Sequence, residues 1–422
     1  MTGRGARDSL MTHDVVAATA IGVGAAARSL PRFGAMRNGL VLIDANVHER
    51  HPSLSSRARH VMVFDPRQES QRELLARAHA EVRREIRSPE GDPAASGSNV
   101  GGIIAIGGGS VMDAAKLLRL LLVSAASFRS VCHAAESFGV SIVPEGWTRS
   151  ATALVMIPTT LGTGSEASAV ACLHGEGAPP SRRLVTGGVM RADTVVLDAG
   201  LTRSLPDRSV REGAAEILLR ILGAYIGSPP RDIPDRAAEE LAARVATHAE
   251  KGVRLGFDDR IREALAIASA ETHTGWALVG RDPFAAKHWY LANELSSAAS
   301  LGKVPVTLGL LPEIWRRIVD GDSRLGDVSR LRRLWRIVAE ALTLPQDPVR
   351  GAAEWASAWG LSPPPVSRDA IARAARGCFE VWGGERPALR GLSEADVLAI
   401  YVVAFSESRM RSCLSTLREE VN

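Results

Sequence analysis

The chain has 422 residues, of which 45% are hydrophobic and 23% charged, a composition that excludes a wholly disordered protein. Lysines and arginines number 51 against 47 acidic residues, and no basic stripe with interleaved aromatics is present, so we expect no nucleic-acid partner. No apolar run reaches the ~18 residues of a membrane span, and we expect neither a membrane partner nor a secretion signal. The four cysteines show no Cys-x-x-Cys spacing, which predicts a reduced, cytoplasmic protein.

Short β-rich runs alternate with helical patterns through the first half of the chain. Hydrophobic periodicity predicts strands at residues 39–44, 60–65, 100–106, 153–157 and 194–197, and helices at 68–86 and 111–123. Strands that alternate with helices form a parallel sheet covered on both faces. The first half is therefore expected to be an α/β unit.

The second half has helical patterns with almost no β-rich run between them. Helices are predicted at residues 210–226, 233–252, 259–276, 312–319, 331–342, 367–382 and 393–405. We therefore predict two domains, an α/β nucleotide-binding domain over residues 1–204 and an all-helical catalytic domain over residues 205–422, with the active site in the cleft between them.

A glycine-rich turn joins the predicted strand at 100–106 to the helix that follows it. The turn contains Gly107, Gly108, Gly109 and Ser110. Glycines let main-chain N–H groups approach a phosphate at the positive end of a helix, and the serine adds a hydroxyl donor. Asp113 follows three residues before Lys116, so an ordinary turn with an ion pair between these two side chains is the structural alternative.

A second polar loop follows the strand at 153–157. It places four hydroxyls, those of Thr159, Thr160, Thr163 and Ser165, within seven residues that also contain two glycines. This density is typical of a loop that holds a polar ligand. The alternative is an ordinary surface loop rich in serine and threonine. This alternative is disfavoured because both motifs occur in the same α/β half.

The two runs together resemble the iron-containing (group III) alcohol dehydrogenase family. They read Gly-Gly-Gly-Ser-x-x-Asp-x-Ala-Lys over 107–116 and Pro-Thr-Thr-x-Gly-Thr-Gly-Ser-Glu over 158–166, and the resemblance covers most of residues 15–320. It implies a dehydroquinate synthase-like fold: an α/β dinucleotide-binding domain with a parallel sheet, then an all-α domain. It also implies a homodimer.

The resemblance implies NAD as the cofactor. Gly107, Gly108, Gly109 and Ser110 would bind the pyrophosphate, with Asp113 beside them, and Thr159, Thr160, Thr163 and Ser165 would line the nucleotide and nicotinamide pocket. Asp44 ends the strand where this family reads the adenosine ribose. A carboxylate there accepts from the 2′-hydroxyl and repels a 2′-phosphate, so we expect NAD rather than NADP.

The family's metal site is incomplete in this sequence. The family uses an Asp and a His four residues apart on one helix, then two further His; here Glu216 and Arg220 take the first two positions. His288 keeps the third, and Lys303 or its neighbour takes the fourth, with His273 as a spare. An arginine has no lone pair to give a metal. Glu216 and His288 remain as candidate ligands for Fe or Zn, and we expect the site to be without metal.

Two cations at metal-ligand positions leave several interpretations open. Arg220 and Lys303 could stabilise a developing alkoxide in place of the metal, with His288 or a water chain as the base. The same cations could hold a substrate carboxylate. Arg220 could instead pair with Glu216 as a buried structural bridge.

The predicted function is an NAD-dependent oxidoreductase acting on an alcohol, in specialised metabolism. The substrate would be a small molecule or a peptide-borne hydroxyl; oxidation of a β-hydroxy acid, followed by loss of CO2, is one version. A cyclase or lyase of the dehydroquinate synthase type, with transient NAD reduction, is one alternative. An NAD-binding pseudoenzyme that supports a partner protein is the other.

Overall fold

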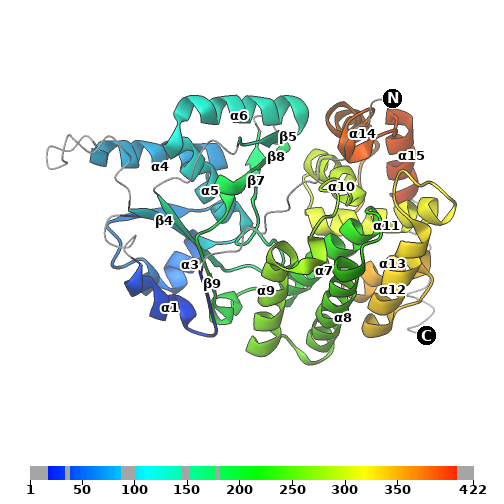
Figure 1. Cartoon of the computed structure of the whole chain (residues 1–422), viewed down its shortest axis with the longest axis horizontal. Coiled ribbons are helices and arrows are strands. Elements are labelled where there is room, and N and C mark those ends of the chain that lie inside the picture. The colour runs from blue at the N-terminus through cyan, green and yellow to red at the C-terminus, as the bar shows by residue number, and fades with distance from the viewer. Residues whose placement is uncertain (1–17, 34–38, 87–100, 145–151, 176–180, 406–422) are drawn as a thin grey trace, which may run out of the picture.

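The molecule has two parts that lie side by side, an α/β part and a helical part (Figure 1). The computed structural model describes residues 18–33, 39–86, 101–144, 152–175 and 181–405. Within this portion every strand lies before residue 198, and from residue 207 onward the regular elements are helices. The predicted boundary between the α/β part and the helical part, near residue 204, falls between these two positions.

A six-stranded parallel sheet forms the centre of the α/β part. Its spatial order is β1 (Ala18–Ile21), β9 (Thr194–Leu197), β6 (Ala153–Pro158), β4 (Gly102–Gly107), β2 (Leu40–Asp44) and β3 (His60–Phe64). β4 is buried along its whole length, as expected for a central strand covered on both faces. The sequence predicted five of these strands within about two residues, and it missed β1.

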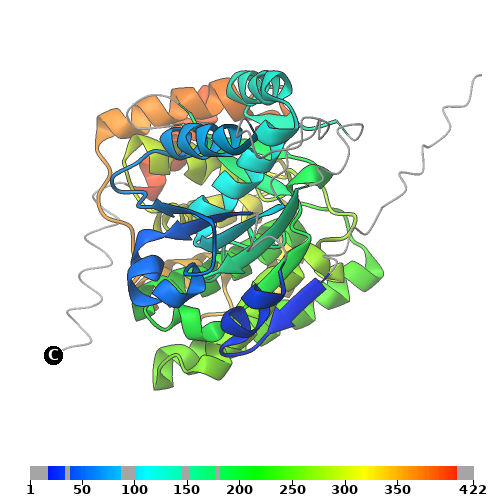
Figure 2. The same cartoon turned by 90° about the vertical axis from the view of Figure 1, so that its left-hand side faces the viewer.

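Helices cover both faces of this sheet because side chains along each strand alternate between the faces. Leu40 and Leu42 of β2 pack with α4 (Gln71–Ile86) and α5 (Gly109–Val123). Val41 and Ile43 pack on the opposite face with α1 (Ala25–Ser29) and α3 (Ala45–Arg50). Figure 2 views this layered arrangement from the side of the α/β part.

The pairing of β4 with β6 brings the two predicted motifs together. Gly107 at the end of β4 lies opposite Pro158 at the end of β6, and the Thr159 N–H donates to the Gly107 carbonyl at 2.9 Å. Both loops therefore leave the sheet at the carboxyl edge of neighbouring strands, where ligands bind in open α/β sheets.

A second, three-stranded sheet was not predicted. It consists of β5 (Val140–Ile142), β8 (Arg182–Thr186) and β7 (Val170–His174), with β7 antiparallel to β8. The helix α6 (Ala125–Phe138), also not predicted, packs against it. This sheet matters for function because β8 places two arginines next to the helical part.

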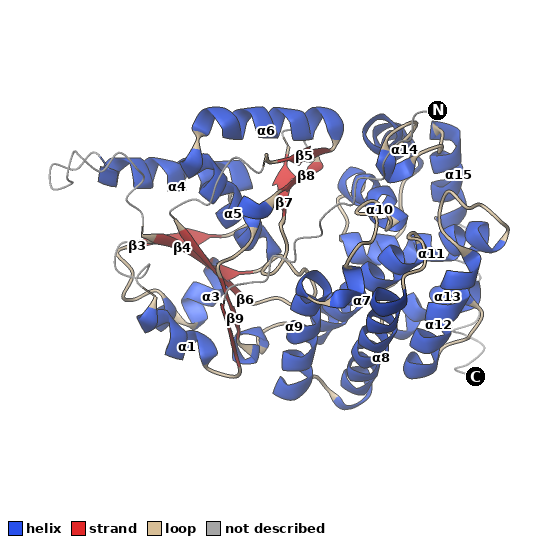
Figure 3. Ribbon diagram, viewed as in Figure 1, coloured by secondary structure: helices blue, strands red, loops and turns tan. Residues whose placement is uncertain are grey.

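The helical part contains nine α-helices among the described residues (Figure 3). They are α7 (Asp207–Ile226), α8 (Asp232–Leu255), α9 (Asp259–Thr274), α10 (Lys287–Ala298), α11 (Lys303–Val319), α12 (Val328–Leu342), α13 (Pro348–Ala358), α14 (Arg368–Trp382) and α15 (Glu394–Ala404). Seven were predicted from periodicity, whereas α10 and α13 were missed. None of the helices that the structure describes is long and apolar enough to cross a membrane.

The predicted start of α11 at Pro312 was wrong. The helix begins at Lys303, and Pro312 lies inside it. Proline is common in the first turn of a helix, which is why the sequence suggested a start there. The correction matters because it makes Lys303 the first residue of a 17-residue helix.

A buried polar network holds α7, α8 and α12 together behind the cleft. Arg330 donates two hydrogen bonds of 2.8 Å to the Asp235 carboxylate, and Arg281 lies 2.9 Å from the same group. The guanidinium groups of Arg330 and Arg281 also lie 3.9 and 5.1 Å from the centre of the Tyr225 ring. Burial by itself raises the pKa of Asp235, but the hydrogen bonds from Arg330 and its neighbours lower it to about 2.

Candidate active site

A cavity of about 610 Å³ runs from the carboxyl edge of the large sheet to helices α7 and α11. This volume is typical of a site for a small molecule or cofactor. Its wall joins residues far apart in the sequence: Asp44 after β2; Gly108, Gly109 and Ser110 after β4; Thr159, Thr160 and Thr163 after β6; Glu216 on α7; and Val304 on α11. Seven of the ten predicted cofactor residues are among them.

The glycine-rich turn opens α5 and packs against the second loop. Gly108 is the residue before the helix and offers no side chain to cap its first N–H groups. A Cβ at Gly108 would lie 3.0 Å from a Thr160 methyl group, and one at Gly109 would lie 3.3 Å from a Thr163 methyl group. The Thr160 hydroxyl is buried without a hydrogen-bond partner, which suits a site whose ligand supplies one.

Asp44 lies at the outer end of the cavity and caps α3. Its Oδ1 accepts from the main-chain N–H groups of Asn46 at 3.0 Å and Val47 at 3.3 Å. Both hydrogen bonds use the same oxygen, so the second carboxylate oxygen has no bond to the main chain among the described residues. Asp44 lines the cavity, and its role at the ribose stays a prediction.

Three predicted cofactor residues, Gly107, Asp113 and Ser165, do not line this cavity. Gly107 is the last residue of β4, where a Cβ would clash with Val111. The Ser165 hydroxyl donates to Asp113 at 2.5 Å, and the other Asp113 oxygen accepts from the Cys172 N–H at 3.0 Å. In this structure Asp113 and Ser165 therefore stabilise the two loops from outside the cavity.

Lys116 completes that support. Its ammonium is fully buried and donates to the Ser165 and Ser168 hydroxyls at 3.0 Å each and to the Val170 carbonyl at 2.7 Å. Burial lowers the pKa of Lys116 to about 8, opposed by the charge of Asp113. Lys116 therefore anchors the second loop to α5. Its contacts go beyond the ion pair with Asp113 on one helix face.

The second loop and helix α7 touch through their main chains. Gly162 has a φ of +94°, and a Cβ there would overlap the Gly213 carbonyl. A Cβ at Gly213 would lie 2.5 Å from the Leu161 carbonyl oxygen. Only glycine fits either position, so these two residues set how closely the cofactor loop approaches the helical part.

Arg220 holds the same loop. Its guanidinium donates to the Gly162 and Thr163 carbonyls at 2.6 and 2.8 Å and to the Thr272 hydroxyl at 3.0 Å. Its distance to the Glu216 carboxylate is 3.8 Å. Burial lowers the pKa of Arg220, and the nearby carboxylates oppose that effect. Three N–H groups of Arg220 donate to other residues of the protein. This arrangement favours a structural role for Arg220 over the predicted contact with the substrate.

His273 lies against the other end of this loop. Its Nε2 would be 2.5 Å from a Cβ at Gly164, and it is buried without a hydrogen-bond partner. Burial and then the charge of Arg220 hold the pKa of His273 well below its usual value. The residue treated as a spare ligand is therefore a neutral imidazole packed beneath the cofactor loop.

His288 lies on α10, and Lys303 is the first residue of α11, directly before Val304, which with Glu216 lines the inner end of the cavity. His288 is only 5% exposed; its ring hydrogen-bonds the main chain of Leu219, and Nε2 has no partner. Burial, followed by the charge of Lys303, lowers the pKa of His288 to about 3. The Lys303 ammonium lies 4.9 Å from the centre of the Trp289 ring, and burial lowers its pKa as well.

The donor set does not fit a metal ion. Among the described residues no group of three His, Cys, Asp or Glu side chains is placed to hold one. Glu216, a predicted ligand, faces the Arg220 guanidinium, and His288, the other, lies within range of the Lys303 charge. Fixed cations beside two isolated donors oppose the binding of a divalent cation.

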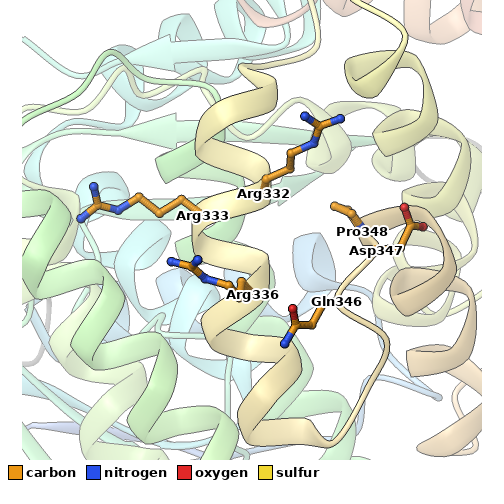
Figure 4. Close-up of a pocket in the computed structure, with 6 residues that line it drawn as sticks. All are labelled: Arg332, Arg333, Arg336, Gln346, Asp347 and Pro348. Atoms are coloured by element: carbon orange, nitrogen blue, oxygen red, sulfur yellow. The ribbon is translucent and has the colours of Figure 1, made fainter.

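A second cavity lies on the outer side of the helical part, between α12 and the start of α13 (Figure 4). It is lined by Arg332, Arg333, Arg336, Gln346, Asp347 and Pro348. Arg333 is already paired with Glu239 at 2.7 Å. No residue singled out by the sequence lies there, so this cavity offers control positions away from the cleft.

The α/β part of the chain is similar in sequence to known dehydrogenases and reductases. The family model described as iron-containing alcohol dehydrogenase matches residues 41–199. A probable alcohol dehydrogenase, EutG of Escherichia coli K12, is 28% identical over 183 residues, which are 43% of this chain and 44% of that protein. A sulfoacetaldehyde reductase of Bilophila wadsworthia is 28% identical over 174 residues, 41% of this chain and 42% of its own length. The matched region thus spans less than half of either relative.

Solved structures extend the similarity of fold to both parts. The NADH-dependent butanol dehydrogenase A of Thermotoga maritima has a TM-score of 0.71 at 15% identity, covering 93% of this chain and 98% of that one. The maleylacetate reductase of Agrobacterium tumefaciens has a TM-score of 0.65 at 16% identity, covering 93% and 96%. Over residues 41–199 the chain is thus similar to the iron-containing alcohol dehydrogenases, and over almost its whole length it has the fold of these solved dehydrogenase and reductase structures.

Proposed function

We propose that the protein is an NAD-dependent oxidoreductase that interconverts an alcohol and its carbonyl partner without a bound metal. The observation that carries the proposal is the single cavity that joins Asp44 and both nucleotide loops to Glu216 and Val304. One end carries residue types that suit a dinucleotide, and the other end is lined by Val304, the residue after Lys303.

The outer and middle parts of the cavity would hold the cofactor. Main-chain N–H groups at Gly108, Gly109 and Ser110, at the start of α5, suit the pyrophosphate. Asp44 suits the ribose hydroxyls and disfavours a 2′-phosphate, which supports NAD over NADP. Thr160 and Thr163 line the inner stretch, toward α7. When bound, NAD⁺ supplies the hydride acceptor for the reaction.

The inner residues would manage the proton and the charge on the substrate oxygen. In oxidation, the carbinol C–H bond breaks as a hydride, the O–H proton leaves and a C=O bond forms. Since the pKa of His288 is lowered to about 3, its imidazole stays neutral and its free Nε2 orients the hydroxyl as an acceptor. The Lys303 ammonium stabilises negative charge as it develops on the oxygen. The proton passes on to water.

The likeness to other dehydrogenases supports the reaction class, since relatives are named as alcohol dehydrogenases and as a sulfoacetaldehyde reductase. Within that class we favour a hydroxy acid. A β-hydroxy acid would give a β-keto acid that loses CO2 readily, and a peptide-borne hydroxyl is the second version. A role in specialised metabolism, a homodimeric assembly and a cytoplasmic location are part of the same proposal.

The test is a titration of the protein with NADH in the presence of a chelator, monitored by nicotinamide fluorescence. We expect one NADH per chain, and Gly109→Val should weaken binding at least about ten-fold because the larger side chain fills the space beside Thr163. Gly188→Val is the matched control, since no atom lies within 4 Å of a Cβ at that position. Equal affinity for the two variants would contradict the proposed cofactor site.

Turnover separates the reaction types. A dehydrogenase releases NADH in proportion to the alcohol consumed, whereas a dehydroquinate synthase-like cyclase shows no net NADH. Binding of NADH with no turnover of any alcohol or carbonyl compound in a broad panel would favour the partner-protein alternative.

A further inference from the structure

We infer that the inner end of the cavity holds a carboxylate of the substrate on Lys303, Arg182 and the first turn of α11. The inference deepens the proposed function and rests on it, because it assigns the substrate to the hydroxy acids. Four observations carry it, and each concerns a different group.

The Lys303 ammonium lacks a partner of opposite charge. The described residues give it no hydrogen bond and no ion pair; its recorded contact is with the face of Trp289, at 4.9 Å. Lys116 differs in this respect, because its buried ammonium donates three hydrogen bonds. An ammonium held over a ring in a cleft is a site for an anion from outside the protein.

Arg182 brings a second cation from the α/β part. It is the first residue of β8; its side chain donates to the Ser296 hydroxyl at 3.2 Å, and its carbonyl accepts from the Asn293 amide at 3.0 Å. The Ser296 carbonyl in turn accepts from the Leu301 N–H at 2.9 Å, two residues before Lys303, so the Arg182 side chain lies beside the turn that leads into α11. The described residues provide no carboxylate partner for it.

The next residue shows what a paired arginine looks like at this boundary. Arg183 donates to the Glu294 carboxylate at 2.9 Å, and the Trp382 indole N–H donates to the same oxygen at 2.9 Å. Arg183 and Glu294 are both buried and form an ion pair, although Nε of Arg183 has no hydrogen-bond partner among the described residues. Two neighbouring arginines therefore differ in role: Arg183 joins the two parts of the chain, and Arg182 has charge left for a ligand.

The first turn of α11 adds main-chain donors. Gly302 precedes the helix and has no side chain to cap it; Pro305, at the third position, has no N–H, so the free donors of this turn are the N–H groups of Lys303 and Val304. Val304, in the same turn, lines the cavity. The N-terminus of a 17-residue helix favours negative charge, and Lys303 is its first residue.

The charge balance of the inner site supports an anionic ligand. The groups that shift the pKa of Lys303 most, apart from burial, are Cys172, Arg182, Glu216 and Arg220, and Glu216 is the carboxylate among them. Glu216 is already 3.8 Å from Arg220. One bound carboxylate would compensate the excess positive charge, and the free Nε2 of the buried His288, beside Trp289, would accept from the hydroxyl of the same substrate.

The test compares 3-hydroxybutyrate with its uncharged isostere 3-hydroxybutyramide. Each is titrated calorimetrically into protein already saturated with NADH, so that no oxidation takes place. We expect the carboxylate to bind at least about ten-fold more tightly than the amide. Arg182→Gln should remove most of that difference and leave NADH affinity unchanged, whereas Arg182→Lys should keep part of it.

The control is Arg332→Gln, an exposed arginine of the distant cavity in Figure 4, which should change nothing. Equal binding of carboxylate and amide, or binding of neither, would overturn the inference while NADH binding kept the proposed function intact. An Arg182→Gln protein with unaltered preference for the carboxylate would also overturn it. Failure of NADH itself to bind would overturn both.

Discussion

The two loops of the α/β part and the inner face of the helical part differ in how well they match the pattern of iron-containing alcohol dehydrogenases. Both loops lie within residues 41–199, which match the family model, and they meet around one cavity. On α7 and α11, by contrast, Arg220 and Lys303 stand where the family resemblance calls for metal ligands. Glu216 of α7 and Val304 of α11 line the same cavity as the two loops, so the predicted cofactor residues and the predicted metal position adjoin each other.

The difference follows from what each site is made of. The pyrophosphate region consists of main-chain N–H groups at a helix start, and most side-chain changes leave such groups in place. A metal site consists of side chains, and each replaced ligand removes a bond. Arg220, at the position where the resemblance calls for a metal ligand, donates instead to the carbonyls of Gly162 and Thr163.

The contact between the second loop and α7 gives the strongest test of this comparison. Gly162→Ala should destabilise the protein by about 3 to 5 kcal/mol, the sum of a positive φ and an overlap with the Gly213 carbonyl. The measurement is urea unfolding, together with NADH titration, which should show weaker binding.

Gly256→Ala separates the two causes. Gly256 has a φ of +91°, close to that of Gly162, but no atom lies within 4 Å of a Cβ there. With a φ of +91° and a ψ of 154°, the alanine variant should lose only about 1 to 3 kcal/mol, from backbone strain alone. A loss as large as that of Gly162→Ala would contradict the close contact between loop and helix.

Removing the Arg220 guanidinium should loosen the cofactor loop. We expect Arg220→Met to cost about 2 to 3 kcal/mol, since two buried carbonyls lose charged donors, and to weaken NADH binding. Arg236→Met, which breaks an exposed pair with Asp232, should cost under about 1 kcal/mol. If NADH affinity and stability of Arg220→Met equal those of the natural protein, Arg220 does not position the loop.

Acid should weaken the helical core without involving the cofactor loops. The pKa of Asp235 is about 2 in the folded protein and near 3.8 when unfolded, so its stabilisation is present above pH 4 and is lost as pH falls toward 2. The shift corresponds to about 2 kcal/mol. The gap in unfolding free energy between the natural protein and Asp235→Asn should therefore shrink between pH 5 and pH 2.5. A constant gap would contradict this assignment.

The smallest expected effect concerns the choice of cofactor. Asn caps helices as well as Asp does, so Asp44→Asn should keep the start of α3 and remove only the charge. We expect NADH to bind a few-fold to about ten-fold more weakly and NADPH to bind more tightly. Unchanged affinities for both cofactors would place the ribose away from Asp44.

The sequence predicted the parts of the molecule that depend on local patterns. Strand ends, the glycine turn and the threonine loop all follow from short runs of residues, and Gly108, Ser110 and Thr160 lie where the pattern put them. The partners of long side chains do not follow from such runs. The spacing of Glu216 and Arg220 gave one helix face, but it could not show that the guanidinium reaches the Gly162 carbonyl.

Two other gaps have the same origin. Asp113 and Ser165 carry groups suited to a cofactor, yet they bond each other, because Lys116 needs partners when it is buried. The role of Arg182 was missed because it depends on β8, a strand of a small sheet whose pairing joins distant segments. A helix assigned to start at Pro312 also hid that Lys303 begins α11.

The central claim is that the cofactor site works beside a former metal position now occupied by cations. The most direct measurement is elemental analysis of protein expressed with iron and zinc supplied and purified without chelator, combined with NADH titration of the same sample. We predict one NADH per chain with far less than one metal, and no effect of a chelator on NADH binding or turnover. About one metal per chain, with turnover lost on chelation, would contradict the account.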